Sequence, residues 1–270
     1  MIALENQIED LLAKKETAII RVQTLGNFQV WRNSNPINPR EWGREAAIQL
    51  FQFLVTNRHR AALHKEQIID HIWMADAKSG QQIFKVALHG LNKVLEPERK
   101  SRAESKYIIR QGASYQLNLE DIWIDVEALD QFVALGNQSL GGNPDLAQKA
   151  YREAIELYHG AYLPNRLYED WSTEERERTQ LLVLSALINL SEILVKTNPL
   201  ESVRLTQQAL QIDMTWEDAY RIQMAAYLEK GNRPMAIKTY QQCEKVLEEE
   251  FGIDPLPETR QLFEKIKGIH

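Results

Sequence analysis

The amino-acid sequence predicts two domains in series, an α+β domain followed by an all-α domain. The chain has 270 residues, more than a single domain usually holds. Strand-like and helical patterns are mixed as far as residue 120, and only helical patterns follow Asp121. The charge changes at the same point, because residues 19–120 carry 15 Lys and Arg against 9 Asp and Glu, whereas residues 121–270 carry 15 against 25. We therefore expect an N-terminal arm over 1–18, a first domain over 19–120 and a second over 121–270.

The first domain begins with two strand patterns. Residues 19–25 and 28–31 are rich in β-forming side chains that alternate, and Gly26-Asn27 separates them. A turn-rich loop over residues 33–39 follows. The preceding residues 2–15 have apolar positions on one helical side, but we expect a frayed arm there.

Three helical patterns follow, over residues 42–55, 64–73 and 79–95. The third pattern places Phe84, Leu88, Leu91 and Leu95 on one face at the spacing i, i+4, i+7 and i+11. Ser79 is the expected N-cap, and Pro97 prevents much continuation. Residues 107–117 then predict a strand, a turn at Gly112 and a second strand.

The second half of the chain predicts a helical repeat domain. Ala236-x3-Tyr240, after Ala226-Tyr227 and Gly231, places small and aromatic residues as tetratricopeptide-type helix pairs do. Small residues at these positions let two helix backbones approach closely. The expected helices cover residues 125–136, 144–159, 172–196, 199–211, 215–229, 233–250 and 257–267.

The face of the 79–95 helix opposite its apolar side predicts a nucleic-acid surface. This face has no acidic residue and carries Gln82, Lys85, Val86, His89, Asn92 and Lys93. Lysines approach phosphates, and amide or imidazole groups hydrogen-bond base edges in the major groove. The alternative is an ordinary solvated helix face.

The order of elements favours the nucleic-acid interpretation. A helix–turn–helix followed directly by a basic hairpin is the layout of a winged helix, in which the hairpin lies along the backbone or minor groove. In that hairpin the candidate contacts are Lys106, Arg110 and Ser114. Trp42 and Arg44 are further candidates, because the start of the 42–55 helix can point its amides at a phosphate.

Several motifs carry a family resemblance. The runs Leu88-His-Gly-Leu-Asn-Lys-Val-Leu95 and Tyr107-Ile-Ile-Arg-Gln-Gly-Ala-Ser-Tyr-Gln-Leu117 resemble the recognition helix and wing of the OmpR/PhoB-type winged helix. Residues 122–267 resemble the bacterial transcriptional activator domain, with motifs at Gly160-Ala-Tyr-Leu-Pro164, Tyr168-Glu-Asp-Trp171 and Leu247-Glu-Glu-Glu-Phe-Gly-Ile-Asp-Pro255. In this order, the two parts resemble the SARP family of transcriptional activators.

This resemblance implies a DNA-binding transcription regulator, an activator in most such proteins, with double-stranded DNA as its partner. It implies paired winged helices, so a homodimer is an expected assembly. It also implies a contact with RNA polymerase through the loop at residues 74–78, for which an ordinary connector is the alternative.

The recognition helix departs from the family pattern. His89, Gly90 and Asn92 stand where the family usually has two or three arginines, so a guanidinium that could bind a phosphate is missing. This departure motivates a second hypothesis, a protein-interaction adaptor whose degenerate winged helix binds DNA weakly or not at all. A neutral or acid-covered surface around residues 82–93 and the hairpin would favour the adaptor.

Composition argues against other classes of protein. A single cysteine, Cys243, allows no internal disulfide, and no His or Cys spacing suggests a metal site. We found no catalytic constellation and no phosphate-binding glycine loop, so we expect no enzyme and no cofactor, and a short regulator or a piece of a longer one. The longest apolar stretch, 181–190, is too short for a membrane span, and the N-terminus does not read as a signal peptide. We therefore expect a cytoplasmic protein.

Overall fold

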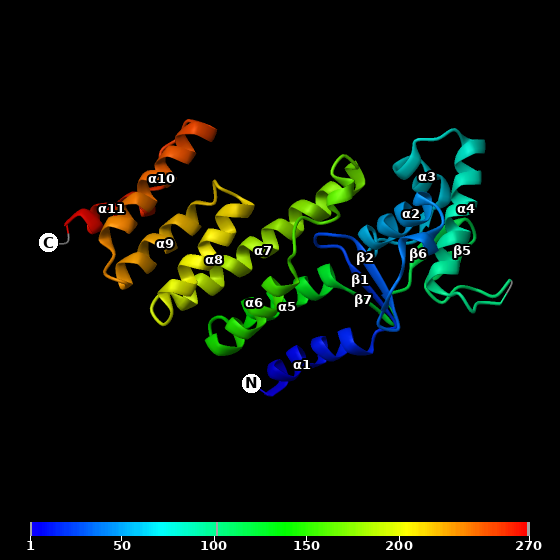
Figure 1. Cartoon of the computed structure of the whole chain (residues 1–270), viewed down its shortest axis with the longest axis horizontal. Coiled ribbons are helices and arrows are strands. Elements are labelled where there is room, and N and C mark those ends of the chain that lie inside the picture. The colour runs from blue at the N-terminus through cyan, green and yellow to red at the C-terminus, as the bar shows by residue number, and fades with distance from the viewer. Residues whose placement is uncertain (1, 101, 269–270) are drawn as a thin grey trace. The chain divides into compact units, whose positions relative to one another are not determined.

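The structure, a computed structural model, describes residues 2–100 and 102–268 (Figure 1). Packing divides the chain into two compact units. One unit contains residues 6–128 and 159–179, and the other contains residues 129–158 and 180–268 together with the first residues up to Glu5. The first unit is α+β and the second is all-helical, which confirms the predicted fold class.

A small sheet forms the N-terminal part of the first unit. Strand β1 (Ile20–Gln23) pairs antiparallel with β2 (Gln29–Arg32) and parallel with β7 (Ile122–Ile124), and the short β3 (Asn35–Pro36) pairs with β2. The sequence predicted β1 and β2 but not β7. All three residues of β7 are buried, so this strand lacks the alternation that marks a strand with one solvated face.

Three helices follow this sheet in the predicted order. They are α2 (Glu45–Thr56), which a 3-10 turn at Pro39–Trp42 precedes, then α3 (Lys65–Trp73) and α4 (Ala77–Leu95). The N-cap of α4 is Asp76 and not Ser79 as predicted. The Asp76 carboxylate accepts hydrogen bonds from the backbone N–H groups of Lys78 and Ser79, each at 3.1 Å, so α4 begins two residues earlier than expected.

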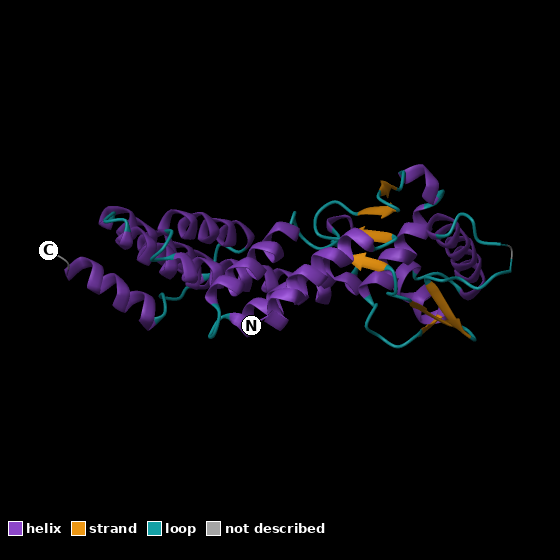
Figure 2. Ribbon diagram, turned by 90° about the horizontal axis from the view of Figure 1, so that it is seen from below, coloured by secondary structure: helices purple, strands orange, loops and turns teal. Residues whose placement is uncertain are grey.

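The predicted hairpin forms a second sheet. Strands β5 (Ile108–Gln111) and β6 (Ser114–Leu117) pair antiparallel, and β4 (Leu63–His64) pairs with β6. Figure 2 shows the strands of the two sheets as separate groups. The hairpin is held at its turn as well, because Lys65 at the start of α3 donates its backbone N–H to the Ala113 carbonyl at 2.9 Å. The helix–turn–helix with its wing is thus confirmed.

The first residues form a helix, and the prediction of a frayed arm was wrong. Helix α1 covers Ile2–Thr17. The side chain of Ile8 is fully buried, and the ammonium group of Lys15 lies 5.2 Å from the centre of the Trp123 ring. Burial of an apolar side chain offsets the entropy that favours fraying at a chain end.

The second unit consists of helices that pack in antiparallel succession. A cluster of Met224, Ala236, Tyr240 and Ile266 joins α9 (Glu217–Glu229), α10 (Arg233–Phe251) and α11 (Pro257–Gly268). The Tyr240 ring stacks on Phe263 with centroids 3.8 Å apart. Ala236 and Tyr240 therefore play the predicted tetratricopeptide-like roles. The helices from Asp125 onward are α5 (Asp125–Ser139), α6 (Pro144–Leu157), α7 (Thr173–Leu194), α8 (Pro199–Ile212), α9 (Glu217–Glu229), α10 (Arg233–Phe251) and α11 (Pro257–Gly268).

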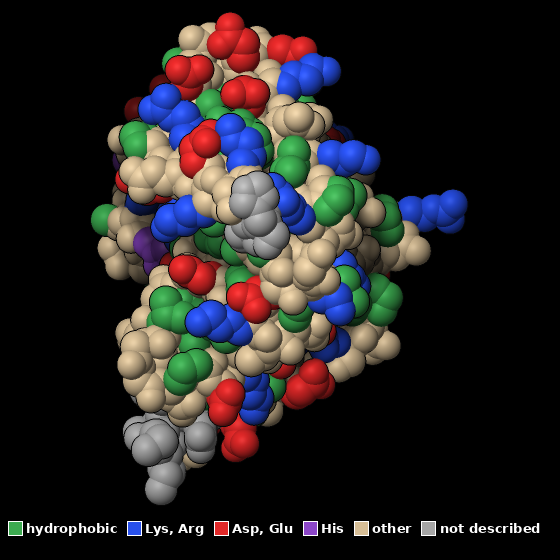
Figure 3. Space-filling view, turned by 90° about the vertical axis from the view of Figure 1, so that its left-hand side faces the viewer, with side chains coloured by type: hydrophobic (Ala, Val, Ile, Leu, Met, Phe, Trp, Pro, Cys, Tyr) green, Lys and Arg blue, Asp and Glu red, His purple; other side chains and the backbone are tan. Residues whose placement is uncertain are grey.

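The surface seen from the side of α10 and α11 carries charges of both signs. Figure 3 shows acidic and basic side chains interspersed there, with apolar side chains between them. Phe251, Ile253 and Leu256, around the α10–α11 junction, are each more than half exposed. Among the described helices, none has the length and hydropathy needed to cross a membrane.

Candidate nucleic-acid interface

Helix α4 is positioned by one apolar face. Phe84, Ala87, Leu91, Val94 and Leu95 are buried along it, much as the periodicity predicted. Leu88, which the sequence placed on the same face, is only partly buried.

The C-terminal end of α4 is held from the first sheet. Arg32 on β2 donates a hydrogen bond to the Val94 carbonyl and pairs with Glu41 at 3.2 Å. The direction of α4 is therefore set by packing along its length and by a charged hydrogen bond at its end.

The opposite face of α4 is exposed and cationic. The side chains of Gln82, Lys85, His89 and Lys93 are exposed there, and Val86 is half-buried. The helix has no acidic residue, and none of its three lysines forms an ion pair with any described residue. Lys78, in the first turn, is an exposed cation that the sequence analysis did not select. Five of the predicted contacts thus lie on one helix that carries unpaired positive charge.

Asn92 is a correction to the predicted outward face. It is 7% exposed, and its side-chain oxygen has no hydrogen-bond partner in the described part of the chain. Asn92 lies next to Leu91 and one turn after Leu88, at the border of the apolar face. Helical periodicity locates the centre of a buried face but not its width.

Gly90 also faces the protein and not the outside. A Cβ atom added to Gly90 would lie 3.2 Å from the Ala47 Cβ atom on α2 and 3.5 Å from the Trp42 carbonyl oxygen. The glycine therefore permits α4 to approach α2 closely. An arginine side chain at this position would start against α2 and not on the exposed face of α4.

The two cations of the wing differ in whether a carboxylate pairs with them. The Lys106 ammonium donates a hydrogen bond to Asp121, which raises the pKa of Lys106 and keeps the ammonium protonated. The Asp121 carboxylate offsets part of its positive charge. Arg110 donates from Nε to the Gly112 carbonyl at 2.8 Å and lies over the Tyr115 ring, with no carboxylate partner among the described residues. Ser114 is half-buried on β6. Arg110 is therefore the freer of the two wing cations.

Trp42 and Arg44 lie on different sides of the backbone. The Trp42 side chain is 5% exposed and packs against Phe28 and Phe51, with centroid distances of 6.4 and 5.7 Å. Its indole is a core group, which corrects the expectation that this side chain meets a ligand. Arg44 is the exposed N-terminal cap residue of α2 and forms no ion pair with a described residue.

A segment far along the sequence completes the unit that carries these residues. We call residues 159–172 the strap; it precedes α7 and belongs to the α+β unit. It joins the end of β1 through backbone hydrogen bonds, from Gly26 to the Ala161 carbonyl at 3.0 Å and from Leu163 to the Thr24 carbonyl at 2.8 Å. A Cβ atom on Gly26 would lie 2.9 Å from the His159 carbonyl oxygen. Glycine is therefore needed where the strap crosses the backbone that follows β1.

Polar side chains fix the strap to α2. Arg166 donates to Gln52 at 2.7 Å and pairs with Glu45, and the Tyr162 hydroxyl lies 2.8 Å from the Thr56 hydroxyl. Sequence analysis found the strap only as a motif, at residues 160–164 and 168–171.

Arg58, just after α2, pairs with two carboxylates that belong to the same α+β unit. It forms ion pairs with Glu127 and Glu175, the latter at 2.7 Å. Burial alone would lower the pKa of Arg58, but the two carboxylates outweigh it and raise the pKa. The scaffold that carries α4 therefore includes residues from beyond position 120.

Comparison with protein families matches residues 124–267 to the bacterial transcriptional activator domain. Among solved structures, the fold is similar to that of Mycobacterium tuberculosis EmbR, determined in complex with a low-affinity phosphopeptide, with a TM-score of 0.78 at 15% identity. The match covers 93% of this chain and spans 65% of the EmbR chain. At this identity the likeness concerns the fold alone. No curated protein matches.

Proposed function

The chain belongs to the bacterial transcriptional activator domain family, and from this premise we propose that it is a DNA-binding transcription regulator, acting as an activator. The family match and the common fold confirm the resemblance to SARP-type regulators that the motifs indicated. We propose that α4 enters the major groove and that the wing, residues 106–117, lies along the backbone or the minor groove.

One observation carries this proposal: the exposed side of α4 presents Lys78, Lys85 and Lys93 without any acidic residue or ion-pair partner among the described residues. A helix fits the major groove of duplex DNA, and unpaired cations on it gain free energy by releasing counterions from the phosphates.

Each exposed residue has a role that suits its chemistry. We propose that Lys85, Lys93, Arg44 and Arg110 contact phosphates, with Ser114 as a hydrogen-bonding neighbour and Lys106 as a weaker contact because of Asp121. Gln82 and His89 are suited to hydrogen bonds with base edges, and the half-buried Val86 to a thymine methyl group. Trp42 supports this surface from the core.

The positions of Gly90 and Asn92 argue against the alternative, a protein-interaction adaptor with a degenerate winged helix. That hypothesis rested on Gly90 and Asn92 as lost DNA contacts, but Gly90 lies close to α2 and the Asn92 side chain is buried. We therefore propose no second function.

The helical unit and the 74–78 loop are the proposed sites of protein contacts. Met74 in this loop is 85% exposed with a left-handed backbone, which suits a contact with RNA polymerase. A dimer of two copies and a cytoplasmic location complete the proposal, with chain-order domains at 19–120 and 121–270. We propose no catalytic activity, and the described residues contain no cluster of three or more metal-ligating side chains.

A mobility-shift experiment on a pool of genomic DNA fragments tests the proposal. Lys85→Ala and Lys93→Ala should each weaken binding and reduce the magnitude of the log–log salt slope by about 1. Lys238→Ala, at an exposed lysine of α10, is the matched control and should leave binding unchanged. Equal DNA affinity in the wild type and the three variants would show that α4 does not contact DNA.

A further inference from the structure

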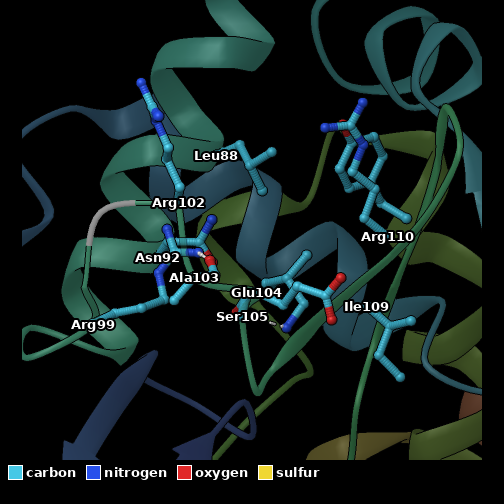
Figure 4. Close-up of a pocket in the computed structure, with 11 residues that line it drawn as sticks. Leu88, Asn92, Arg99, Arg102, Ala103, Glu104, Ser105, Ile109 and Arg110 are labelled. Atoms are coloured by element: carbon cyan, nitrogen blue, oxygen red, sulfur yellow. Dashed lines mark hydrogen bonds between the residues drawn. The ribbon is translucent and has the colours of Figure 1, made fainter.

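A pocket of about 400 Å³ lies in the α+β unit between α4, the loop that follows it and the wing. Figure 4 shows side chains from all three elements around it. Such a volume lies within the range of small-molecule sites, about 300–1,000 Å³. None of the proposed DNA contacts except Arg110 lines this pocket.

The wall of the pocket is partly apolar. Leu88 of α4 and Ile108 and Tyr115 of the wing line it, and the Tyr115 ring packs edge-on against Phe84 with centroids 4.9 Å apart. Leu88 was predicted as a core residue and is only partly covered by the protein. An apolar or aromatic group in the pocket would cover it further.

The charge of the lining is positive. Three arginines and one glutamate line the pocket, Arg99, Arg102, Arg110 and Glu104, which gives a net charge of 3 − 1 = +2. Arg102 makes no ion pair or hydrogen bond with a described residue, and Arg99 is positioned by a hydrogen bond to the Ala103 carbonyl at 2.8 Å. A ligand with one anionic group would therefore be attracted.

Asn92 adds a specific hydrogen-bonding demand. It lines the same pocket, and its buried side-chain oxygen is one of the few described buried polar atoms without a partner. Buried polar atoms are normally paired, so a ligand that brings an N–H or O–H group would satisfy it.

We propose that this pocket binds a small amphipathic acid, with an apolar or aromatic body, one anionic group and one hydrogen-bond donor. The bound acid lowers DNA affinity, because it occupies the Arg110 guanidinium and places a negative charge beside α4. This second statement rests on the proposed function. The first statement does not, because the pocket is defined without DNA.

The probe 1-anilinonaphthalene-8-sulfonate tests the first statement. It has aromatic rings, one sulfonate and one N–H group, and its fluorescence rises in apolar surroundings. Titration into the full chain should give saturable binding that Arg102→Ala weakens about fivefold, the order expected for one partly exposed charged contact. The uncharged N-phenyl-1-naphthylamine should bind the wild type and this variant equally.

Two further variants make the test specific. Ala103 is exposed and lines the pocket, so Ala103→Phe should fill it and abolish binding of both probes without disturbing the core. Arg40→Ala, at an exposed arginine outside the pocket, should leave both affinities unchanged. Equal sulfonate affinity in the wild type, Arg102→Ala and Ala103→Phe, or no saturable binding, overturns the site.

Measuring DNA affinity in the presence of the sulfonate probe tests the two statements separately. The sulfonate should raise the apparent Kd for the best DNA fragment in the wild type and leave it unchanged in Ala103→Phe. Saturable probe binding with unaltered DNA affinity would overturn the coupling and leave the pocket standing. A wild type that binds the probe but no DNA at all would overturn the proposed function and the coupling together.

Discussion

Arg166 donates a hydrogen bond from Nε to the side-chain oxygen of Gln52 over 2.7 Å, and both side chains are buried. The two residues are 114 positions apart in the sequence. Their contact anchors the strap to α2, and α2 in turn packs against α4, the proposed recognition helix. The stability of the unit that carries α4 therefore depends on a segment that belongs to the activator-domain half of the chain.

Arg166→Met should lower the free energy of unfolding by about 2–4 kcal/mol, because the buried Gln52 oxygen loses its charged donor. Urea unfolding followed by fluorescence measures this. Arg204→Met, at an exposed arginine of α8, is the matched control and should change stability little. Equal loss in both variants would show that the strap is not held by this contact.

Acid should weaken the attachment of α7 to Arg58. Burial raises the pKa of Glu175, but the Arg178 hydrogen bonds and the Arg58 charge outweigh it, so the folded-state pKa lies below that of an ordinary glutamate. Glu175 therefore contributes stability above its unfolded-state pKa, and this is lost as the pH falls through the folded-state pKa. The free energy of unfolding should therefore fall as the pH drops below about 4.3, the usual pKa of glutamate.

Glu175→Gln should reduce this dependence on pH, since the amide does not titrate. Glu177→Gln, at an exposed carboxylate on the same helix, should keep the wild-type dependence. Urea titrations at several pH values compare the three proteins. A slope in Glu175→Gln identical to the wild type would exclude this ion pair as the source.

The Asp125 carboxylate holds the end of β1 by hydrogen bonds, so the stability of the protein should depend on its charge. It accepts hydrogen bonds from the Thr24 hydroxyl at 2.6 Å and from the backbone N–H groups of Thr24, Leu25 and Val126 at 2.7 to 2.8 Å. Asp125→Asn directs an NH2 group at these donors, so it should lower the free energy of unfolding by about 2–3 kcal/mol. Thermal unfolding should show the loss, whereas the exposed Asp145→Asn should melt like the wild type.

Gly90→Arg and His89→Arg should separate packing from DNA contact on α4. Gly90→Arg brings a side chain against Ala47, so it should destabilise the protein by about 1–3 kcal/mol without strengthening DNA binding. His89→Arg adds a cation to the exposed face, so it should steepen the log–log salt slope by about 1. Stability and mobility-shift titrations on both variants decide this, and tighter DNA binding by Gly90→Arg would contradict the assigned packing.

Most elements could be predicted, because they are local. The apolar spacing of Phe84, Leu91 and Leu95 located α4, and the change of pattern after Asp121 located the helical half. The errors came from positions whose environment other elements supply. Asn92 is polar yet buried beneath neighbouring elements, and α1 is helical because the fold buries Ile8. The sequence predicted the candidate site as a helix face. It did not predict which cations of the site form ion pairs, because the partner of Lys106, Asp121, lies outside the hairpin.

The sequence alone determined the order of the elements, the cationic outer face of α4 and the family of the second half, because propensity, periodicity and motifs act within a few tens of residues. Only the tertiary structure decided that the strap completes the α+β unit, that Gly90 serves packing, and that Leu88 and Asn92 open onto a pocket. These outcomes depend on contacts between residues distant in sequence. Such contacts form only when the whole unit buries its apolar surface and pairs its buried polar groups.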